Sequence, residues 1–231
     1  MTPNNQRAAA VRGMFNEIAP RYDLMNRLMT AGMDVSWRKE VIRRAELRPG
    51  ETLLDLGAGT GDLAREALRQ QPAARVTAGD FTLNMMLVGK AGSAIPRDWT
   101  AADALNLPFP GASFDALVSG FLMRNVVDLE QALREQRRVL RPGGRLVCLD
   151  TTRPGRSLLS PFIRFHMRHV IPFLGTLLAG SRSAYTYLPE TSERFLSAEE
   201  LLGRIQSAGF SGTGFRRVNF GTVAIHWGVA G

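Results

Sequence analysis

The sequence predicts an α/β protein with a doubly wound sheet of seven strands, mostly parallel, that ends in an antiparallel hairpin. Between residues 52 and 149, short apolar runs alternate five times with longer segments, most of them with helical periodicity. The last two apolar runs are joined directly by turn residues at Gly221, as in a hairpin. We expect one domain over residues 1–231, because 231 residues suit a single domain with additions.

The first fifty residues are expected to form a helical cap, over about 1–49. Apolar residues recur there at helix-like spacing, and the pattern is interrupted near Pro20 and Gly32. The turn residues 48–50 (Arg-Pro-Gly) end this region.

The alternating part of the chain supplies five strands and three clear helices. Strands are expected at 52–56, 75–79, 99–102, 114–119 and 145–149, and helices at 62–70, 83–91 and 129–140. Asp128 is the expected N-cap of the last helix, and residues 142–144 (Pro-Gly-Gly) are expected to stop it. Right-handed crossovers then place the C-terminal ends of the strands along one edge, where a ligand would bind.

Residues from about 153 to 196 break this alternation. Prolines and glycines interrupt an apolar, aromatic segment, which we interpret as an insertion of short helices. Ser197 and Glu200 then form a capping box that opens a helix to about Ala208. Strands at 214–219 and 223–227 end the chain.

Composition excludes several classes of protein. One cysteine, Cys148, allows neither a disulfide framework nor a zinc site built on cysteine, and it lies in an apolar run typical of a buried strand. His166 and His169 are spaced like a metal pair, but no carboxylate lies between residues 151 and 189, so we expect no metal. No secretory signal or spanning segment is visible, which favours a cytoplasmic protein.

A glycine loop follows the first strand, with the spacing G-x-G-x-G over residues 57–61. This is neither the dinucleotide fingerprint nor a phosphate loop, which needs a lysine after its last glycine. Asp55, Asp62 and Asp80 surround the loop, and no lysine is near. The site therefore suits a cation better than a pyrophosphate, and a sulfonium with an amino-acid tail and a ribose fits.

Acidic residues also follow the next two strands. Asp80 can accept both hydroxyls of a ribose, although it would do the same in an NAD enzyme. Asp103 and Ala104 offer a carboxylate and a backbone N–H that can bind an adenine edge. Together with the loop, these residues favour a methyltransferase.

Five segments are typical of one family: residues 14–26 (MFNEIAPRYDLMN), 54–63 (LDLGAGTGDL), 104–110 (ALNLPFP), 124–126 (RNV) and 138–145 (RVLRPGGR). Through them the whole chain resembles the ubiquinone/menaquinone biosynthesis C-methyltransferase family. The glycine loop is common to many methyltransferases, whereas the first segment paired with Arg-Asn-Val is much more specific. The resemblance implies a Rossmann-like, class I methyltransferase fold, with S-adenosylmethionine as methyl donor and S-adenosylhomocysteine as product.

The resemblance also implies a set of site residues. Arg124 is expected near the reacting ring, where it would stabilise an oxyanion or orient a water, and Asn125 would orient the ring. The chain departs from the family at Gly120, where a serine is frequent, although Ser119 precedes it. The expected cofactor contacts are Tyr22, Asp55, Gly57, Gly59, Thr60, Asp80, Asp103, Ala104 and Ser119.

The implied substrate is a lipid quinol, methylated on a ring carbon; the ring is a naphthoquinol or a benzoquinol. The segment 153–196 carries arginines and apolar residues but no acid before Glu190, which suits a lid over a prenyl tail, a contact with an anionic membrane at its inner face, or a homodimer interface.

Other functions are open at this stage: methylation of another small molecule, methylation of RNA, and a role outside catalysis. The net charge of +8 would suit an RNA methyltransferase, but the chain lacks the Asn/Asp-Pro-Pro-aromatic motif after the fourth strand, and aromatic residues do not interleave with its basic ones. We therefore expect no nucleic-acid partner. A silent binding or assembly protein that keeps the fold is the alternative outside catalysis.

Overall fold

The computed structural model describes residues 3–91, 98–153, 191 and 195–231. The expected insertion at 153–196 lies outside the described residues except at positions 153, 191, 195 and 196.

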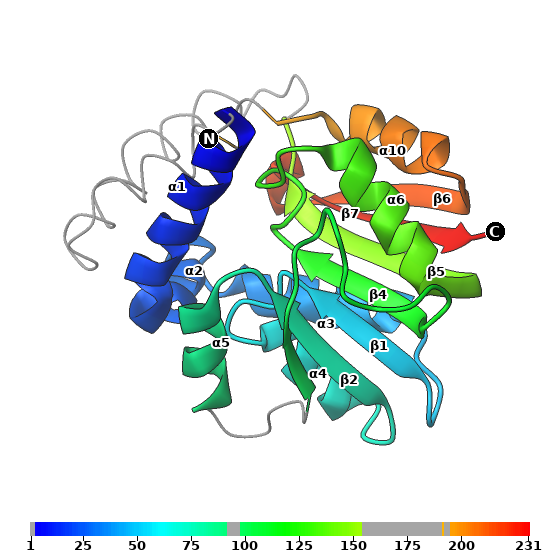
Figure 1. The fold of residues 1–231 in the computed structure, drawn as a ribbon, viewed down its shortest axis with the longest axis horizontal. Coiled ribbons are helices and arrows are strands. Elements are labelled where there is room, and N and C mark those ends of the chain that lie inside the picture. Colours follow the sequence, from blue (N-terminus) through cyan, green and yellow to red (C-terminus); the bar gives the residue numbers. More distant parts are fainter. Residues whose placement is uncertain (1–2, 92–97, 154–190, 192–194) are drawn as a thin grey trace.

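A single seven-stranded sheet forms the centre of the molecule, in the order β3-β2-β1-β4-β5-β7-β6 (Figure 1). The strands from β1 to β5 pair in parallel, and β7 is antiparallel to both β5 and β6. The predicted fold, a mostly parallel sheet with an antiparallel C-terminal hairpin, is confirmed. The strands are β1 (Thr52–Leu56), β2 (Arg75–Asp80), β3 (Asp98–Ala101), β4 (Phe114–Gly120), β5 (Leu140–Thr151), β6 (Phe210–Val218) and β7 (Val223–Ala230).

The C-terminal half of the sheet is longer than the sequence predicted. β5 begins at Leu140, where the helix was expected to continue, because Leu140 already pairs with Phe114. Residues 142–144, which were expected only to stop the helix, lie inside β5, at a register shift before Ala116 pairs with Arg145. β6 likewise begins at Phe210, four residues early, and tolerates a shift between Ser211 and Gly214.

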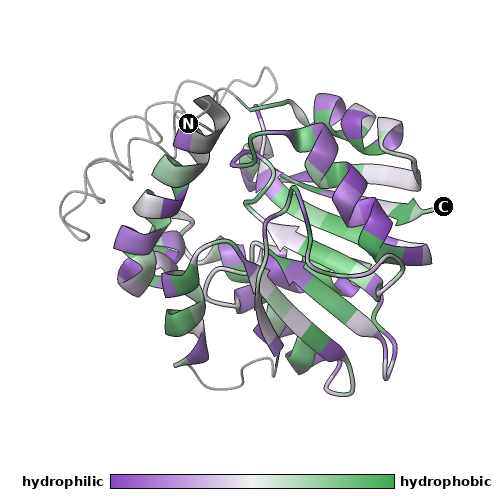
Figure 2. Cartoon of the chain, viewed as in Figure 1, coloured by the Kyte–Doolittle hydropathy of each residue, from purple (hydrophilic) through white to green (hydrophobic). Residues whose placement is uncertain are grey.

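Helices cover both faces of the sheet, with their polar residues outward and the apolar strands between them (Figure 2). The capping residues are those predicted: Asp128 accepts from the Gln131 backbone, and Ser197 and Glu200 form the capping box. Besides a 3-10 turn at Asn219–Gly221, the described helices are α1 (Pro3–Ile18), η1 (Ala19–Arg21), α2 (Tyr22–Met29), α3 (Met33–Ala45), α4 (Asp62–Gln70), α5 (Leu83–Lys90), α6 (Leu129–Val139) and α10 (Ala198–Ser207).

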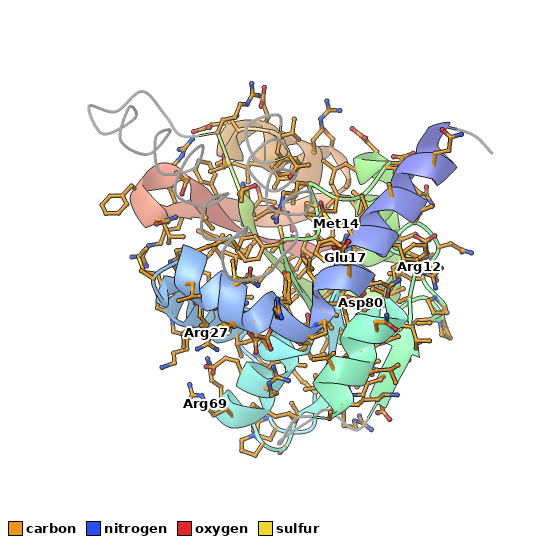
Figure 3. All side chains as sticks on the ribbon, turned by 90° about the vertical axis from the view of Figure 1, so that its left-hand side faces the viewer. Arg12, Met14, Glu17, Arg27, Arg69 and Asp80 are labelled. Atoms are coloured by element: carbon orange, nitrogen blue, oxygen red, sulfur yellow. The ribbon has the colours of Figure 1, made fainter. Side chains whose placement is uncertain are left out.

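The N-terminal helices divide between two places. α3 packs on β4 and β5, alongside α4, and so belongs to a layer of the sheet. α1 and η1 instead contact α5. In Figure 3, α1 and Asp80, the last residue of β2, lie on the same side of the molecule. This arrangement brings α1 and α2 over the C-terminal ends of the strands.

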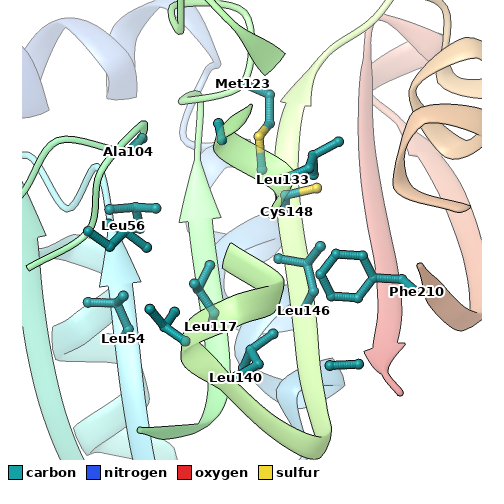
Figure 4. Close-up of a cluster of buried hydrophobic side chains, with 14 of the residues drawn as sticks. Leu54, Leu56, Ala104, Leu117, Met123, Leu133, Leu140, Leu146, Cys148 and Phe210 are labelled. Carbon is teal, nitrogen blue, oxygen red and sulfur yellow. The ribbon is translucent and has the colours of Figure 1, made fainter. Parts of the chain in front are cut away.

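Alternation along the strands builds two cores. Leu54, Leu117 and Leu146 face α6 and α10 in the cluster shown in Figure 4. Their neighbours Leu53 and Val118 face α3 and α4 in a second cluster. Cys148 is fully buried in the first cluster, and burial raises the pKa of its thiol, as suits a packing residue.

Candidate functional site

The glycine loop links β1 to α4 through backbone conformations that favour glycine. Gly57, Gly59 and Gly61 have φ values of 69°, 58° and 90°. The backbone N–H groups of Gly57 and Ala58 donate to Gly79 O at 2.8 and 3.0 Å, so β2 holds the start of the loop. A Cβ on Gly59 would lie 3.2 Å from Met85 Cε, so glycine lets α5 pack closely against this part of the loop.

A cavity of about 610 Å³ opens beside the loop, at the C-terminal ends of the strands. Asp80, Asp103 and Ala104 all line it, as predicted from their positions after successive strands. Asp80 is buried; it accepts from Gly59 N at 2.7 Å and from Thr82 N at 2.6 Å, which fixes its carboxylate at the rim. Desolvation by burial raises its pKa, so a cation or a hydroxyl donor would be favoured there.

Helix α1 supplies the opposite wall of this cavity. Arg12, Gly13, Phe15 and Asn16 line it, and the Arg12 guanidinium lies 5.0 Å from the centre of the Phe81 ring. The sequence predicted a helical cap but not which of its residues face the ligand. The cap therefore shields the cavity from solvent on the side away from the sheet.

Tyr22 lies where α2 begins, and it lines both this cavity and a smaller one behind the loop. Its ring packs edge-on against Phe15, with 6.0 Å between ring centroids. Burial raises its pKa, so the hydroxyl stays protonated at neutral pH. Thr60 is buried, and its hydroxyl donates to Asp23 Oδ1 at 2.6 Å, which ties the glycine loop to α2.

Asp55 lies at the bottom of the site, fully buried. Its Oδ2 accepts from Ala64 N at 2.9 Å, whereas its Oδ1 has no hydrogen-bond partner among the described residues. Burial raises its pKa to about 7, and the nearby carboxylates of Asp80 and Asp62 act in the same direction. A buried oxygen without a partner is a position where a ligand's donor would be stabilised.

The segment after β4 forms the wall that faces the loop. Asn125 lines the large cavity, and its Nδ2 donates to Phe121 O at 2.8 Å. Phe121 adopts a φ of 61°, which is rare for a bulky residue, so strain is held at the point where the strand turns into the wall. Arg124 is buried, pairs with Asp150 at 2.6 Å, and lines a neighbouring cavity of about 510 Å³.

Ser119 and Gly120 end β4 beside the loop. Gly120 lines both the large and the small cavity, whereas Ser119 is fully buried and lines neither. The Ser119 hydroxyl has no hydrogen-bond partner among the described residues. A contact from Ser119 to a cofactor stays a prediction.

Three side chains of the site were missed by reasoning from sequence alone: Arg38, Asp23 and Asp150. Arg38 from α3 lines the small cavity, Asp23 accepts from the glycine loop, and Asp150 holds Arg124. The matching segment at 14–26 could have suggested Asp23, because it lies next to Tyr22 in that segment. Arg38 and Asp150 carried no comparable signal.

Together these groups form a site for a cation that also carries a polar chain. Asp55, Asp62 and Asp80 lie around the glycine loop, and a metal-like cluster of three or more ligands is absent from the part of the chain that the structure describes. The unpartnered Asp55 Oδ1 fits S-adenosylmethionine, whose sulfonium and ammonium are positive.

Comparison with known proteins agrees with this geometry. Residues 1–230 match the model of the ubiE/COQ5 methyltransferase family. A ubiquinone/menaquinone biosynthesis C-methyltransferase UbiE from Desulfotalea psychrophila is 45% identical over 222 residues, which cover 95% of this chain and 89% of the relative. A demethylmenaquinone methyltransferase from Thermus thermophilus is 42% identical over 218 residues, 93% of this chain and 99% of the relative.

Solved structures share the fold at low sequence identity. A SAM-dependent methyltransferase from Thermotoga maritima superimposes with a TM-score of 0.68 at 18% identity, over 95% of this chain and 99% of that one. The cyclase SpnF gives the same TM-score and identity, over 95% and 94%. These likenesses concern the fold alone.

Proposed function

Because the chain belongs to the ubiE/COQ5 methyltransferase family, we propose that it transfers a methyl group from S-adenosylmethionine to a ring carbon of a prenylated quinol. The observation that carries the substrate side is the cavity of about 610 Å³, whose acidic rim at Asp80 and Asp103 faces an apolar wall. That wall is lined by Phe121, Leu122 and Val126. One wall suits the polar cofactor, and the other suits a flat, apolar ring.

The chain's own residues would divide the work as follows. Asp80 would accept hydrogen bonds from a ribose, and Asp103 and Ala104 would contact the adenine. S-adenosylmethionine supplies an electrophilic methyl group, so alignment of the acceptor carbon would provide most of the acceleration. Asn125, fixed by its bond to Phe121 O, would orient the ring.

Arg124 would act on charge rather than on protons. An acceptor carbon becomes nucleophilic when a neighbouring hydroxyl loses its proton, and a nearby cation stabilises the resulting oxyanion. Arg124 is held as a buried cation by Asp150, and it lies close enough to Tyr22 to influence that hydroxyl. A permanent cation is a poor base, so the proton would leave to another group or to water.

A membrane contact would deliver the prenylated substrate. Among the described residues no helix is long and apolar enough to cross a bilayer, so the contact we propose is peripheral, at the inner, cytoplasmic face. Leu24 and Leu28 on α2 and Leu83 and Leu87 on α5 are exposed near the cap, beside Arg27. Flotation with anionic vesicles at low salt would test this contact, and absence of binding would count against it. Light scattering would test the homodimer, the other role suggested for segment 153–196.

The central experiment is labelled methyl transfer to quinols with a short prenyl tail. The purified chain would be incubated with methyl-labelled S-adenosylmethionine and either demethylmenaquinol or the benzoquinol precursor, with total tRNA as a third acceptor. We expect label on the ring carbon of one quinol or of both, and none on tRNA. Cofactor binding without transfer to either quinol would support a silent binding protein instead, and label on tRNA would support the RNA alternative.

A further inference from the structure

A second, much smaller cavity of about 30 Å³ adjoins the large one behind the glycine loop. Five residues line both spaces: Tyr22, Gly57, Gly59, Gly120 and Phe121. The two spaces therefore lie side by side at the glycine loop.

The two cavities are lined by different charges. Asp80 and Asp103 line only the large cavity, whereas Arg38, Asp55 and Asp62 line only the small one. The small cavity has room for only a few atoms, such as the charged end of a ligand, since one water already needs roughly 10–15 Å³. A ribose or an adenine would have to stay in the large cavity.

Arg38 is the only cation that lines the small cavity among the described residues. It extends from α3, is 8% exposed, and its Nη1 donates to Asp34. Its Nη2 lies 3.3 Å from Asp62 Oδ2, an oxygen that receives no hydrogen bond. Asp34 and Asp62 thus hold the guanidinium by charge from two sides. Nη2 makes no hydrogen bond to Asp62.

Complementary charges in the small cavity match the two ends of an amino acid. The unpartnered Asp55 Oδ1 could accept from an ammonium, but it would repel a carboxylate. A carboxylate needs a cation, and a guanidinium forms strong, geometrically specific bonds with it. Arg38 is the group in this cavity that can provide them.

We propose that Arg38 binds the carboxylate of the methionine part of S-adenosylmethionine, with Asp55 on the ammonium beside it. The inference rests on the proposed function and adds a specificity residue to it. The group that the small cavity would recognise is the α-amino-acid end of the cofactor, next to the glycine loop. The alternative is a purely structural Arg38, which only pairs with Asp34 on its own helix and with Asp62 on α4.

Three ligands separate these roles in a binding titration. S-adenosylmethionine has both charged ends, decarboxylated S-adenosylmethionine lacks only the carboxylate, and 5′-methylthioadenosine lacks the amino acid altogether. For the unmodified protein we expect S-adenosylmethionine to bind about ten- to a hundredfold more tightly than its decarboxylated form, the range for one charge-assisted hydrogen-bond pair. Arg38→Met should bring that ratio to within about threefold of one, because the carboxylate is the only group of the ligand that loses its partner.

Control variants keep the result interpretable. Arg43→Met makes the same change on α3 at an exposed arginine that pairs with Glu40, and it should leave the ratio unchanged. Binding of 5′-methylthioadenosine by Arg38→Met should stay within about threefold of the unmodified protein, which shows that the site is folded. If that variant binds none of the ligands, Arg38→Gln, which keeps a donor for Asp34, takes its place and should show the same loss of ratio.

Each outcome has one meaning. Equal binding of the two S-adenosylmethionine forms by the unmodified protein would overturn the inference and leave the proposed function intact. An unchanged ratio in Arg38→Met or Arg38→Gln would overturn it as well. Failure of the unmodified protein to bind any of the three ligands would instead overturn the proposed function.

Discussion

The guanidinium of Arg124 lies 2.6 Å from Oδ1 of Asp150, and both side chains are almost fully buried. Asp150 Oδ2 also accepts from the Arg124 backbone at 3.2 Å. Arg124 lies in the segment that follows β4 and Asp150 lies near the end of the neighbouring strand β5, so the pairing of these strands brings the two residues together. The pair fixes a buried positive charge at the neighbouring cavity of about 510 Å³.

Removing one partner of the Arg124–Asp150 pair should lower both the unfolding free energy and the turnover, for different physical reasons. Arg124→Met leaves Asp150 as an uncompensated buried charge, which typically costs about 3–5 kcal/mol of unfolding free energy. Arg124→Met with Asp150→Leu should recover most of that loss, because an apolar pair of similar volume replaces two charges. Urea denaturation would measure both, and labelled methyl transfer at saturating cofactor should stay low in both variants. Recovery of turnover in the double variant would remove Arg124 from the mechanism.

Asp55 should make the free energy of unfolding depend on pH. Burial raises its pKa to about 7 from an ordinary value of about 3.9. The folded protein therefore holds a proton that the unfolded chain releases between roughly pH 4 and 7, so this contribution falls as pH rises through that window. Its full size is at most about 4 kcal/mol.

Asp55→Asn isolates this contribution. The variant should lose less unfolding free energy between pH 4.5 and 7.5 than the unmodified protein does, as measured by denaturant titration without ligand. Asp23 and Asp80, whose pKa values are also raised by burial, are present in both proteins and cancel in the comparison. Parallel pH profiles would show that Asp55 does not titrate in this range.

Cofactor binding should then release protons near neutral pH. An ammonium beside Asp55 would favour its carboxylate form and lower its pKa again. Calorimetry of S-adenosylmethionine binding in buffers of different ionisation enthalpy should show net proton release at pH 6.5, and less of it in Asp55→Asn. Equal release by the two proteins would assign the proton to another group.

Much of the fold could be predicted because its signals are local. β1 and α4 have the predicted bounds, Thr52–Leu56 and Asp62–Gln70. The local pattern of apolar residues is enough to mark where each of these elements begins and ends. The start of β5 could not be predicted in the same way. Leu140 continues the apolar spacing of α6, and only its pairing with Phe114, far away in sequence, ends the helix at Val139.

The site residues also differ in whether a local sequence pattern identifies them. The places of Asp80, Asp103 and Ala104 at the cavity could be predicted because each lies at or just beyond the end of a strand, and parallel strands end at one edge. Asp150, by contrast, ends the fifth strand without a motif, and its role depends on Arg124, 26 positions away. Arg38 lies on an amphipathic helix among other arginines, and only the packing of α3 distinguishes it from Arg43.

The bond from the Thr60 hydroxyl to Asp23, 2.6 Å long, should stabilise the closed cap. Thr60→Val keeps the shape but leaves Asp23 without this donor, which should weaken cofactor binding by about ten- to a hundredfold, as expected for a hydrogen bond to a charged group. Thr60→Ser retains the hydroxyl and should bind within about threefold of the unmodified protein. Equal binding by the valine and serine variants would show that the cap does not depend on this bond.

Gly89 sets how closely α5 approaches the glycine loop. A Cβ there would lie 2.5 Å from Thr60 O and 2.4 Å from the Trp99 ring, so Gly89→Ala must move the helix or the loop. We expect a loss of about 1–3 kcal/mol in unfolding free energy, together with weaker cofactor binding, because the displaced backbone belongs to the site.

Gly203 on α10 provides the matched control, since a Cβ at that helical position has no neighbouring heavy atom within 4 Å. Gly203→Ala should raise the unfolding free energy by about 0.5–1 kcal/mol, because alanine loses less backbone entropy in a helix, and it should leave cofactor binding unchanged. Thermal denaturation and calorimetric titration of both variants test the pair. If Gly89→Ala behaved like Gly203→Ala, close contact between α5 and the loop would not be required for the site.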